Sequence, residues 1–436
     1  MRGTAELRRA ILARTAPVAV LGQGYVGLSL ACATAEAGFP VVGIDTDAER
    51  LEGLAEGRLT VPGLGSEVFE SALATGRLNF SAVADPVATA RLIFICVPTP
   101  LRDQSPDLSF VEEACRNVAK HLQPGSLVVL ESTTYPGTTA EIVCPLLEAG
   151  SGLISGKGFL LAYSPERVDP GDALYTFAQV PRLVAGHTPE AAGTAITFYE
   201  QLVDKVVGVS STKAAELAKL LENAFRHTNI ALVNEMAILC HEMNIDVWEV
   251  IDAAATKPFG FMKFTPGPGV GGHCIPLDPT YLTWQVKRDL GRQFRMLEQA
   301  QDINTMMPTW TSDRIAEVMS DRGIPLKGAN ILVLGVSYKP DIGDARESPS
   351  LAVMARLRKR GAKVTFHDPY FEEVSVAGET YERAELSKRT LASSDCVALL
   401  TPHAAYDLDW IAEHSNLVFD ARNAYGSVPV PRVVRL

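Results

Sequence analysis

The sequence predicts an α/β protein with two doubly wound parallel sheets joined by a long helical segment. Short apolar runs alternate with stretches of helical periodicity in both the N-terminal and the C-terminal part of the 436-residue chain, and this alternation is typical of parallel strands covered by helices. Between these parts, the segment from Lys213 to about Asn244 has no proline or glycine. One helix of that span would be about 45 Å long. Long helices of this kind often form dimer interfaces, so we expect a homodimer.

The length and composition indicate a globular chain of several domains. A chain of 436 residues is long for one domain, and 47% of the residues are hydrophobic, which is enough to build cores. We expect an N-terminal α/β domain over residues 1–207, a central helical region over 208–308 and a C-terminal α/β domain over 309–436.

The sequence also argues against several classes of protein. No uninterrupted apolar run reaches the ~18 residues of a membrane span, and Arg14 interrupts the N-terminal stretch before it could form a signal-peptide core. The seven cysteines are widely spaced without a CxxC pair, which indicates reduced thiols in the cytoplasm. A formal net charge of −11 argues against nucleic acid as the main partner.

A glycine-rich turn follows the first apolar run. Residues Pro17–Leu21 lead directly into a Gly-x-Gly-x-x-Gly pattern at 22–27, and a helical stretch follows. Such glycines permit a tight turn and let a pyrophosphate approach the helix N-terminus. The next apolar run ends at Asp45, where a carboxylate would bind a ribose and repel a 2′-phosphate. We therefore predict a Rossmann-like NAD site, with a purely structural turn as the alternative.

Two further apolar runs of the N-terminal part end in small polar residues. Leu92–Val97 is followed by Pro98-Thr99-Pro100, and Leu127–Leu130 by Glu131-Ser132-Thr133. In a doubly wound sheet, ligands bind at the carboxyl ends of the strands. Both ends are therefore candidates for the same site.

Cys274 lies inside the glycine-rich segment Gly267–Asp278, with a carboxylate four residues after the thiol. Glycines let the backbone approach a ligand closely, and an accessible thiol favours chemistry over core filling. The alternative is a turn with a buried thiol, in which Asp278 only caps the helix that Pro279 begins. His273 adjoins the thiol, but no second Cys/His cluster supports a metal site, and we expect no metal.

Three further candidates are ambiguous by themselves. Lys219 and Asn223 lie one turn apart on the long helix, and Glu166 stands in a turn after a predicted strand. Each has an ordinary alternative: a solvated lysine, a surface amide and a loop carboxylate.

The C-terminal part repeats the strand–helix alternation without the glycine pattern. Asn330–Leu334 runs into a loop that contains Lys339 and Arg346. These side chains are either ordinary loop charges or cations placed to meet an anionic ligand at the strand end. The pattern predicts a second Rossmann-like domain.

Over nearly its whole length, the chain resembles the UDP-glucose/GDP-mannose dehydrogenase family. The matching motifs are Gly22-x-Gly24-x-x-Gly27, Ser132-Thr133 with Pro136-Gly-Thr-Thr139, Ser164-Pro-Glu166, Lys219-x-x-x-Asn223, Gly271–Asp278 and the segment from Lys339 to Pro349. Within the family, segments 255–262 and 266–269 look most like those of UDP-N-acetylglucosamine 6-dehydrogenases.

The resemblance implies oxidation of the C6 alcohol of a UDP-hexose, UDP-GlcNAc before others, to the uronate in two hydride transfers to NAD. Cys274 would form a thiohemiacetal and then a thioester. Lys219 and Asn223 would stabilise the oxyanion. Asp278 would act as a base through a water, and Glu166 would assist hydrolysis.

The resemblance also implies the members of each site. The catalytic residues would be Cys274, Lys219, Asn223, Asp278, Glu166 and Thr133. The cofactor would contact Gly22, Gln23, Gly24, Tyr25, Val26, Gly27, Asp45, Arg50, Val97, Pro98, Thr99, Ser132, Thr133 and Arg346. The UDP-sugar would contact Glu166, Arg167, Lys219, Asn223, Lys257, Phe264, Gly267, Gly271 and Lys339.

Four residues depart from the pattern of many relatives: Pro170, Lys263, Thr265 and Leu277. Lys263 and Thr265 adjoin the glycine loop and therefore bear on the choice of sugar. UDP-glucose or dTDP-glucose is the alternative substrate. A single-step hydroxyacid-type dehydrogenase is the alternative enzyme, and an NAD-sensing protein without activity is the alternative of another class.

Overall fold

The computed structural model describes residues 2–59, 61, 64–103, 105–167, 176–272, 275–427 and 430–436. The chain forms two compact units, Met1–Glu222 and Asn223–Leu436. The boundary falls inside the long helix α8 (Thr212–Glu242), which has nearly the bounds expected from the sequence. The predicted α/β class, with a parallel sheet near each end of the chain, is confirmed.

The described part of the N-terminal unit contains an eight-stranded sheet in the order β10-β9-β8-β7-β4-β1-β2-β3. Its strands are β1 (Val18–Leu21), β2 (Val41–Ile44), β3 (Leu78–Ser81), β4 (Leu92–Ile95), β7 (Leu127–Leu130), β8 (Leu160–Tyr163), β9 (Arg182–Gly186) and β10 (Val206–Gly208). Neighbouring strands are parallel, apart from β8 with β9. Strand β1 lies between β4 and β2, so the sheet is extended first on one side of β1, by β2 and β3, and then on the other, by β4 and β7. Ligands bind at such a switch point.

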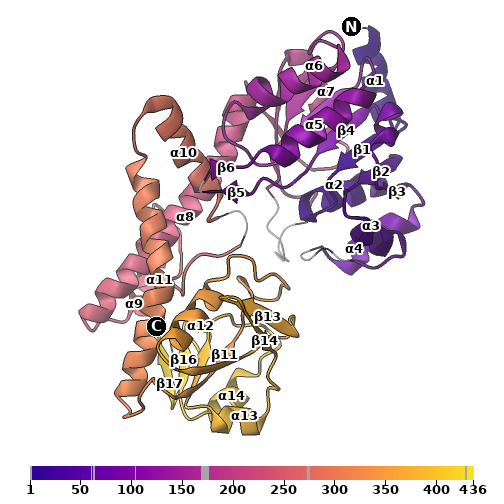
Figure 1. Ribbon diagram of the computed structural model, residues 1–436. Helices are drawn as coiled ribbons and strands as arrows, with labels where there is room; N and C mark the ends of the chain where they lie inside the picture. Colours follow the sequence, from indigo (N-terminus) through magenta and orange to yellow (C-terminus); the bar gives the residue numbers. More distant parts are fainter. Residues whose placement is uncertain are drawn as a thin grey trace. The chain divides into compact units, whose positions relative to one another are not determined.

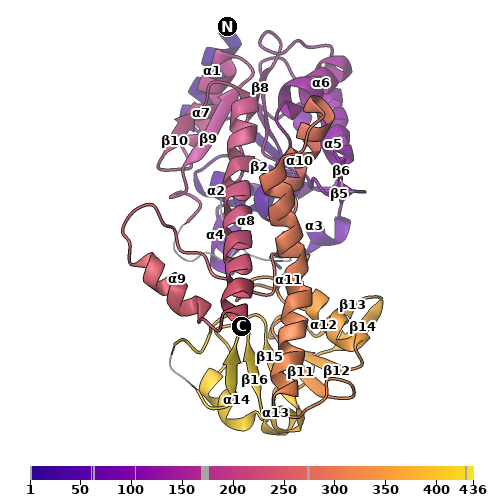
Figure 2. The same cartoon turned by 90° about the vertical axis from the view of Figure 1, so that its left-hand side faces the viewer.

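Helices cover both faces of this sheet. Their bounds are α1 (Arg2–Leu12), α2 (Tyr25–Glu36), α3 (Ala48–Ala55), α4 (Ser66–Ala74), α5 (Ser109–His121), α6 (Cys144–Ser151) and α7 (Pro189–Tyr199). Figure 2 shows α1 and α7 on one side of the strands and α5 and α6 on the other. Leu7, Leu28 and Phe198 share a core with Val20 and Val129. Each such buried side chain contributes about 1.5–3 kcal/mol, which explains why β1, β4 and β7 are apolar throughout.

The described part of the C-terminal unit contains a five-stranded parallel sheet in the order β12-β11-β15-β16-β17. Its strands are β11 (Asn330–Leu334), β12 (Lys363–His367), β15 (Cys396–Leu399), β16 (Val418–Asp420) and β17 (Val433–Arg435), and α12 (Pro349–Lys359), α13 (Lys388–Ser393) and α14 (Leu408–His414) flank it. Strands β13 (Glu373–Val376) and β14 (Glu379–Glu382) form a separate antiparallel hairpin. Here too, the first strand of the sheet, β11, lies between later ones, β12 and β15 (Figure 2).

The same unit contains the C-terminal part of α8 with α9 (Val247–Ala255), α10 (Asp278–Leu290) and α11 (Arg295–Ser320). Figure 1 and Figure 2 both show α8 beside α11, and Ala231 packs there against Ala300 and Ile303. Helix α9 is tied to β17 by an ion pair of 2.5 Å between Asp246 and Arg435. None of the described helices has the length and apolarity to cross a membrane.

Candidate active site

The glycine turn between β1 and α2 is shaped by close backbone contacts. Gly22 has φ +89°, and a Cβ there would lie 2.5 Å from the carbonyl oxygen of Cys96. A Cβ on Gly27 would lie 1.8 Å from the carbonyl oxygen of Gly22. Gly24 directly precedes α2, and a Cβ on it would have no neighbouring atom within 4 Å. The open space beside Gly24, at the N-terminus of α2, is where the sequence predicts that a pyrophosphate binds.

Asp45 lies beside this turn at the end of β2. Its Oδ2 accepts the N–H of Gln23 at 2.6 Å and Nη1 of Arg50 at 3.0 Å. The side chain of Gln23 is buried, and its Nε2 donates to the carbonyl of Val20 at 2.8 Å. Gln23 and Asp45 thus hold the turn in shape, while Tyr25 and Val26 are half-buried at the start of α2.

The ends of β4 and β7 are joined at the same edge of the sheet. The hydroxyl of Ser132 donates to the carbonyl of Val97 at 2.7 Å. Thr99 is buried, Thr133 is half-buried and Pro98 is exposed. The two strand ends that the sequence singled out therefore lie together.

Glu166 follows β8 and is nearly buried. Its Oε1 accepts the N–H of Arg167 at 2.7 Å, and its Oε2 accepts Nη2 of Arg182 at 2.6 Å. The side chain of Arg167 turns to α8, where it pairs with Glu222 at 2.7 Å. Arg182 could not be recognised from the sequence because its partner lies sixteen residues away in another element.

Asn223 and Asp278 are brought together from α8 and from the first residue of α10. The amide Nδ2 of Asn223 donates to Oδ2 of Asp278, and both side chains are buried. Lys219, half-buried, lies one turn before Asn223 on α8. Leu277 occupies the cap position of α10 without a side-chain hydrogen bond. The capping role considered for Asp278 is therefore wrong, because its carboxylate faces Asn223 instead.

Cys274 and His273 lie outside the described residues, so their predicted roles rest on the sequence. Within the described ranges, no group of three His, Cys, Asp or Glu side chains is arranged to hold a metal ion.

The start of the glycine loop is held by a buried amide chain. The N–H of Gly267 donates to Oδ1 of Asn234 at 3.0 Å, and Nδ2 of Asn234 donates to Oδ1 of Asn304 at 2.9 Å. Further along, the N–H of Gly272 donates to the carbonyl of Arg346 at 3.1 Å. A Cβ on Gly271 would lie 2.7 Å from Tyr338. The loop therefore packs closely on the segment after β11, which requires glycine at this position.

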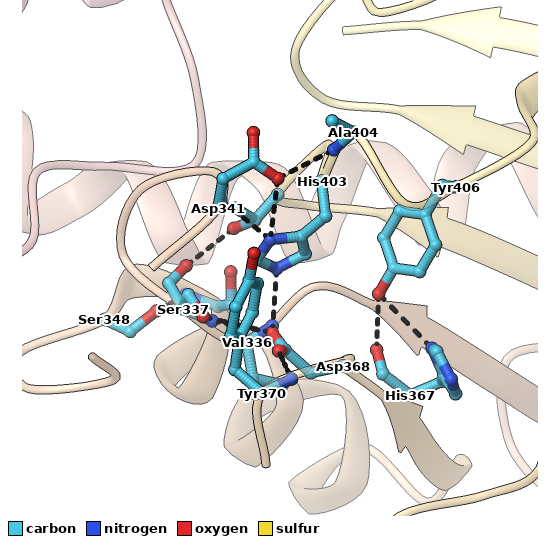
Figure 3. A network of polar contacts seen from close by, with 12 residues as sticks. Val336, Ser337, Asp341, Ser348, His367, Asp368, Tyr370, His403, Ala404 and Tyr406 are labelled. Atoms are coloured by element: carbon cyan, nitrogen blue, oxygen red, sulfur yellow. Dashed lines mark hydrogen bonds and ion pairs between the residues drawn. The ribbon is translucent and has the colours of Figure 1, made fainter. Parts of the chain in front are cut away.

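The segment after β11, which contains Lys339, is anchored by two buried side chains (Figure 3). Oδ2 of Asp368 accepts the N–H of Val336 at 2.7 Å, and Nε2 of His403 donates to the same oxygen at 3.0 Å. The N–H of Asp341 donates to Nδ1 of His403 at 3.0 Å. Because Nδ1 accepts this hydrogen bond, it carries no hydrogen, and the ring hydrogen of His403 is on Nε2.

This anchoring makes Asp368 a firmly ionised group. Burial raises its pKa, but hydrogen bonds from His403 and from the N–H groups of Tyr370 and Val336 outweigh burial and lower the pKa below its usual value. Lys339 is half-buried in the anchored segment. Arg346 pairs with Asp344 at 2.6 Å, and its side chain is 61% exposed, so it remains accessible to a ligand.

Arg422 is a candidate binding residue that the sequence analysis missed. It follows β16, and its Nε donates to the carbonyl of Leu400 at 3.2 Å. A Cβ on Gly267 would lie 2.3 Å from Nη1 of Arg422, so this guanidinium adjoins the glycine loop. Burial lowers its pKa to about 10, opposed by the charge of Asp420. A cation held in this way favours an anionic neighbour. No local pattern in the sequence marks it.

The remaining predicted substrate residues follow α9. Lys257 is exposed, with its Nζ 4.9 Å from the ring centre of Phe259, and Phe264 is half-buried with its ring centre 5.9 Å from that of Phe225. Lys263, which departs from the pattern of relatives, forms an ion pair with Asp252 at 2.5 Å. Of the other departures, Thr265 is exposed and Pro170 lies outside the described residues.

Three family models match successive parts of the chain. The models of the UDP-glucose/GDP-mannose dehydrogenase family describe its NAD binding domain, over residues 16–203, its central domain, over 213–306, and its UDP binding domain, over 332–427. The glycine turn lies in the first match, the Asn223–Asp278 contact in the second and the anchored segment with Lys339 in the third.

Individual proteins resemble the chain over most of its length. A UDP-N-acetyl-D-mannosamine dehydrogenase of Pyrococcus horikoshii is 34% identical over 425 residues, which cover 96% of this chain and 98% of the relative. A UDP-N-acetyl-D-glucosamine 6-dehydrogenase of Pseudomonas aeruginosa is 35% identical over 356 residues, 81% of this chain and 82% of the relative. A solved structure of a UDP-D-ManNAc dehydrogenase from Pyrococcus horikoshii has a TM-score of 0.87 at 32% identity, covering 96% of this chain and 98% of the other.

Proposed function

The chain belongs to the UDP-glucose/GDP-mannose dehydrogenase family, and we propose that it oxidises the C6 alcohol of a UDP-hexose to the uronate through a thioester on Cys274. NAD is the cofactor of this family, and when bound it accepts one hydride in each of two oxidation steps. The conversion of an alcohol to an acid removes four electrons, so one sugar requires two NAD.

In this proposal, the side chains of the chain bind, orient and move protons. The thiolate of Cys274 adds to the C6 aldehyde, and a thioester remains after the second hydride leaves the adduct. Lys219 and Asn223 donate to the oxyanion that develops at C6. Asp278 takes a proton from the attacking water, assisted by Glu166, and hydrolysis breaks the C–S bond to release the uronate and the thiolate.

The hydrogen bond between Asn223 and Asp278 is the observation that best supports this proposal. These residues are separated by 55 positions in the sequence, and the resemblance to the family independently implies that both belong to one reaction centre. Asp278 also stands four residues after Cys274. A hydroxyacid-type dehydrogenase has no use for that cysteine, and a sensing protein has no use for a buried amide–carboxylate pair.

For the sugar, we propose UDP-GlcNAc as the first candidate, on the likeness of segments 255–262 and 266–269 to the enzymes that act on it. The relatives named for UDP-N-acetyl-D-mannosamine and for UDP-N-acetyl-D-glucosamine have nearly equal sequence identities to the chain, 34% and 35%. Lys263, which forms an ion pair with Asp252, departs from the pattern of many relatives. UDP-glucose or dTDP-glucose is therefore the alternative substrate.

The purified protein is expected to produce NADH fastest from UDP-GlcNAc. The measurement is initial NADH formation with UDP-GlcNAc, UDP-ManNAc, UDP-GalNAc, UDP-glucose and dTDP-glucose at equal concentrations. A roughly tenfold higher kcat/KM for another sugar, worth about 1.4 kcal/mol of transition-state stabilisation, would reassign the substrate and leave the chemistry intact. NADH formation from none of them would contradict the proposed activity.

We also propose a homodimer, with the C-terminal part of α8 in the interface. Phe225, Leu232, Leu239 and Met243 are 44–59% exposed, and their helical spacing places them on one face. Exposed apolar stripes of this kind commonly mark protein interfaces. Sedimentation should give twice the 46.9 kDa of one chain, and Leu232→Glu should reduce it to one chain. A monomer at micromolar concentration would contradict the proposal.

We place the reaction in the cytoplasm. The seven cysteines are spaced as in proteins whose thiols stay reduced, and a thiolate nucleophile requires a reducing compartment. A UDP-sugar is the expected small-molecule partner, because the C-terminal sheet matches the UDP binding domain of the family.

A further inference from the structure

A buried charged cluster lies behind Glu166 in the N-terminal unit. Arg182, the first residue of β9, is fully buried and donates from Nη2 to Oε2 of Glu166 at 2.6 Å. Its Nη1 lies 3.6 Å from Oε2 of Glu131, which directly follows β7 and is also buried. The hydroxyl of Tyr199, the last residue of α7, donates to Oε1 of Glu131. One guanidinium therefore faces two carboxylates from different strand ends.

The orientation of this guanidinium is fixed on its faces as well as at its edge. Its central carbon lies 4.5 Å from the ring centre of Phe177 and 5.8 Å from that of Tyr199. Nη1 also donates to the carbonyl of Pro165 at 3.3 Å, one residue before Glu166. A guanidinium is planar and its donors form a rigid fork. These contacts therefore fix the orientation of Arg182, and with it the position at which Glu166 is bound.

The charges of the cluster are unequal in number. Arg182 carries one positive charge, whereas Glu131 and Glu166 carry two negative charges when both are ionised. Burial raises the pKa of Glu131 to about 7, although the charge of Arg182 opposes this. The charged and titratable groups that face Glu131 are Arg182, Glu166, Tyr199 and the thiol of Cys96. As the pH falls through about 7, Glu131 takes up a proton. The positive charge of Arg182 then pairs with the carboxylate of Glu166 alone.

We propose that Arg182 is a positioning residue, which holds the carboxylate of Glu166 in the orientation that hydrolysis of the acyl intermediate requires. This inference rests on the proposed function of Glu166. With Oε2 bound to Arg182 and Oε1 bound to the N–H of Arg167, the carboxylate is held at both oxygens. Through Glu131, the same guanidinium links Glu166 to the strand end that contains Ser132 and Thr133.

The direct test is steady-state kinetics of Arg182→Gln and Arg182→Lys, with Arg116→Gln as the control. Arg116 forms an exposed ion pair with Glu112 on α5, so its loss should leave kcat unchanged. In Arg182→Gln, kcat is expected to fall roughly 100-fold, as for a reacting group displaced by about 1 Å. NAD affinity, measured by protein fluorescence, should stay within about threefold. Arg182→Lys retains a cation, so its kcat should be at least about tenfold higher than that of Arg182→Gln.

The pH profile separates positioning from a structural role. Removing a cation that faces two carboxylates favours their protonated forms, so the acidic limb of the kcat profile should move to higher pH by about one unit in Arg182→Gln. A defect in folding alone would lower kcat equally at every pH. Unchanged kcat in Arg182→Gln, or an unmoved profile with Lys no better than Gln, would overturn the inference. Failure of the unmodified protein to form uronate would refute the proposed function instead.

Glu131→Gln provides a second test should Arg182→Gln not fold. The amide preserves the shape of Glu131 and removes its titration, so Arg182 serves Glu166 at every pH. The ratio of kcat in Glu131→Gln to kcat in the unmodified protein should rise from about pH 6 to about pH 8, since only the unmodified Glu131 ionises in that range. A ratio that is constant with pH would contradict the inference.

Discussion

Replacing Cys274 with serine is expected to stop release of the uronate while leaving NAD binding intact. A serine hydroxyl is far harder to ionise than a thiol at neutral pH, so the nucleophile is lost. Any oxygen ester that forms is a poorer acyl intermediate than a thioester. The measurement is quantification of uronate by mass spectrometry over many turnover times, and we expect at most a slowly released adduct.

The control for this variant is Cys144→Ser. Cys144 is buried at the start of α6 in the N-terminal unit, so its replacement tests whether loss of any cysteine slows the protein. We expect acid formation at the unmodified rate. Acid formation by Cys274→Ser at that same rate would exclude a covalent intermediate on Cys274 and favour a hydroxyacid-type reaction.

Replacing Lys219 with alanine is expected to lower kcat by roughly 10²–10³, as removal of one oxyanion donor commonly does. The side chain is half-buried on α8, one turn before the buried Asn223. Because alanine favours helix, the variant should keep its thermal stability. The measurement is kcat with saturating NAD and sugar nucleotide, together with the melting temperature.

Lys213→Ala is the matched control on the same helix. Lys213 is 63% exposed and lies 3.5 Å from Glu141, in an ion pair at the surface. Such a pair contributes little, and kcat should not change. Equal kcat values in the two variants would assign Lys219 to the ordinary solvated face of α8.

The fold could be predicted from the sequence wherever local pattern and burial agree. Strand β4, whose residues are all buried, appears in the sequence as an uninterrupted apolar run. Helix α8 is marked by the absence of proline and glycine. The glycine turn could be predicted because its Gly-x-Gly-x-x-Gly spacing directly follows an apolar run. These features depend on neighbours in sequence or on the face of one element.

The remaining features depend on contacts between distant segments, which a single sequence does not reveal. Arg182 meets Glu166 and Glu131 from three different strand ends. His403 meets Asp368 across 35 residues, and Arg422 reaches Gly267 from the end of the chain. The capping role considered for Asp278 was wrong for the same reason, since its carboxylate accepts a hydrogen bond from Asn223 on α8. Charged and polar groups at such sites have ordinary local surroundings.

The number of NADH molecules formed per sugar nucleotide distinguishes a four-electron oxidation of the sugar from a two-electron oxidation. A limiting amount of the best sugar nucleotide should be converted completely in excess NAD, with NADH followed by absorbance and the product by mass spectrometry. Because an alcohol-to-acid oxidation removes four electrons and each NAD accepts two, we expect two NADH per sugar, a uronate and no accumulated aldehyde. One NADH per sugar, with an aldehyde or ketone as the final product, would contradict it.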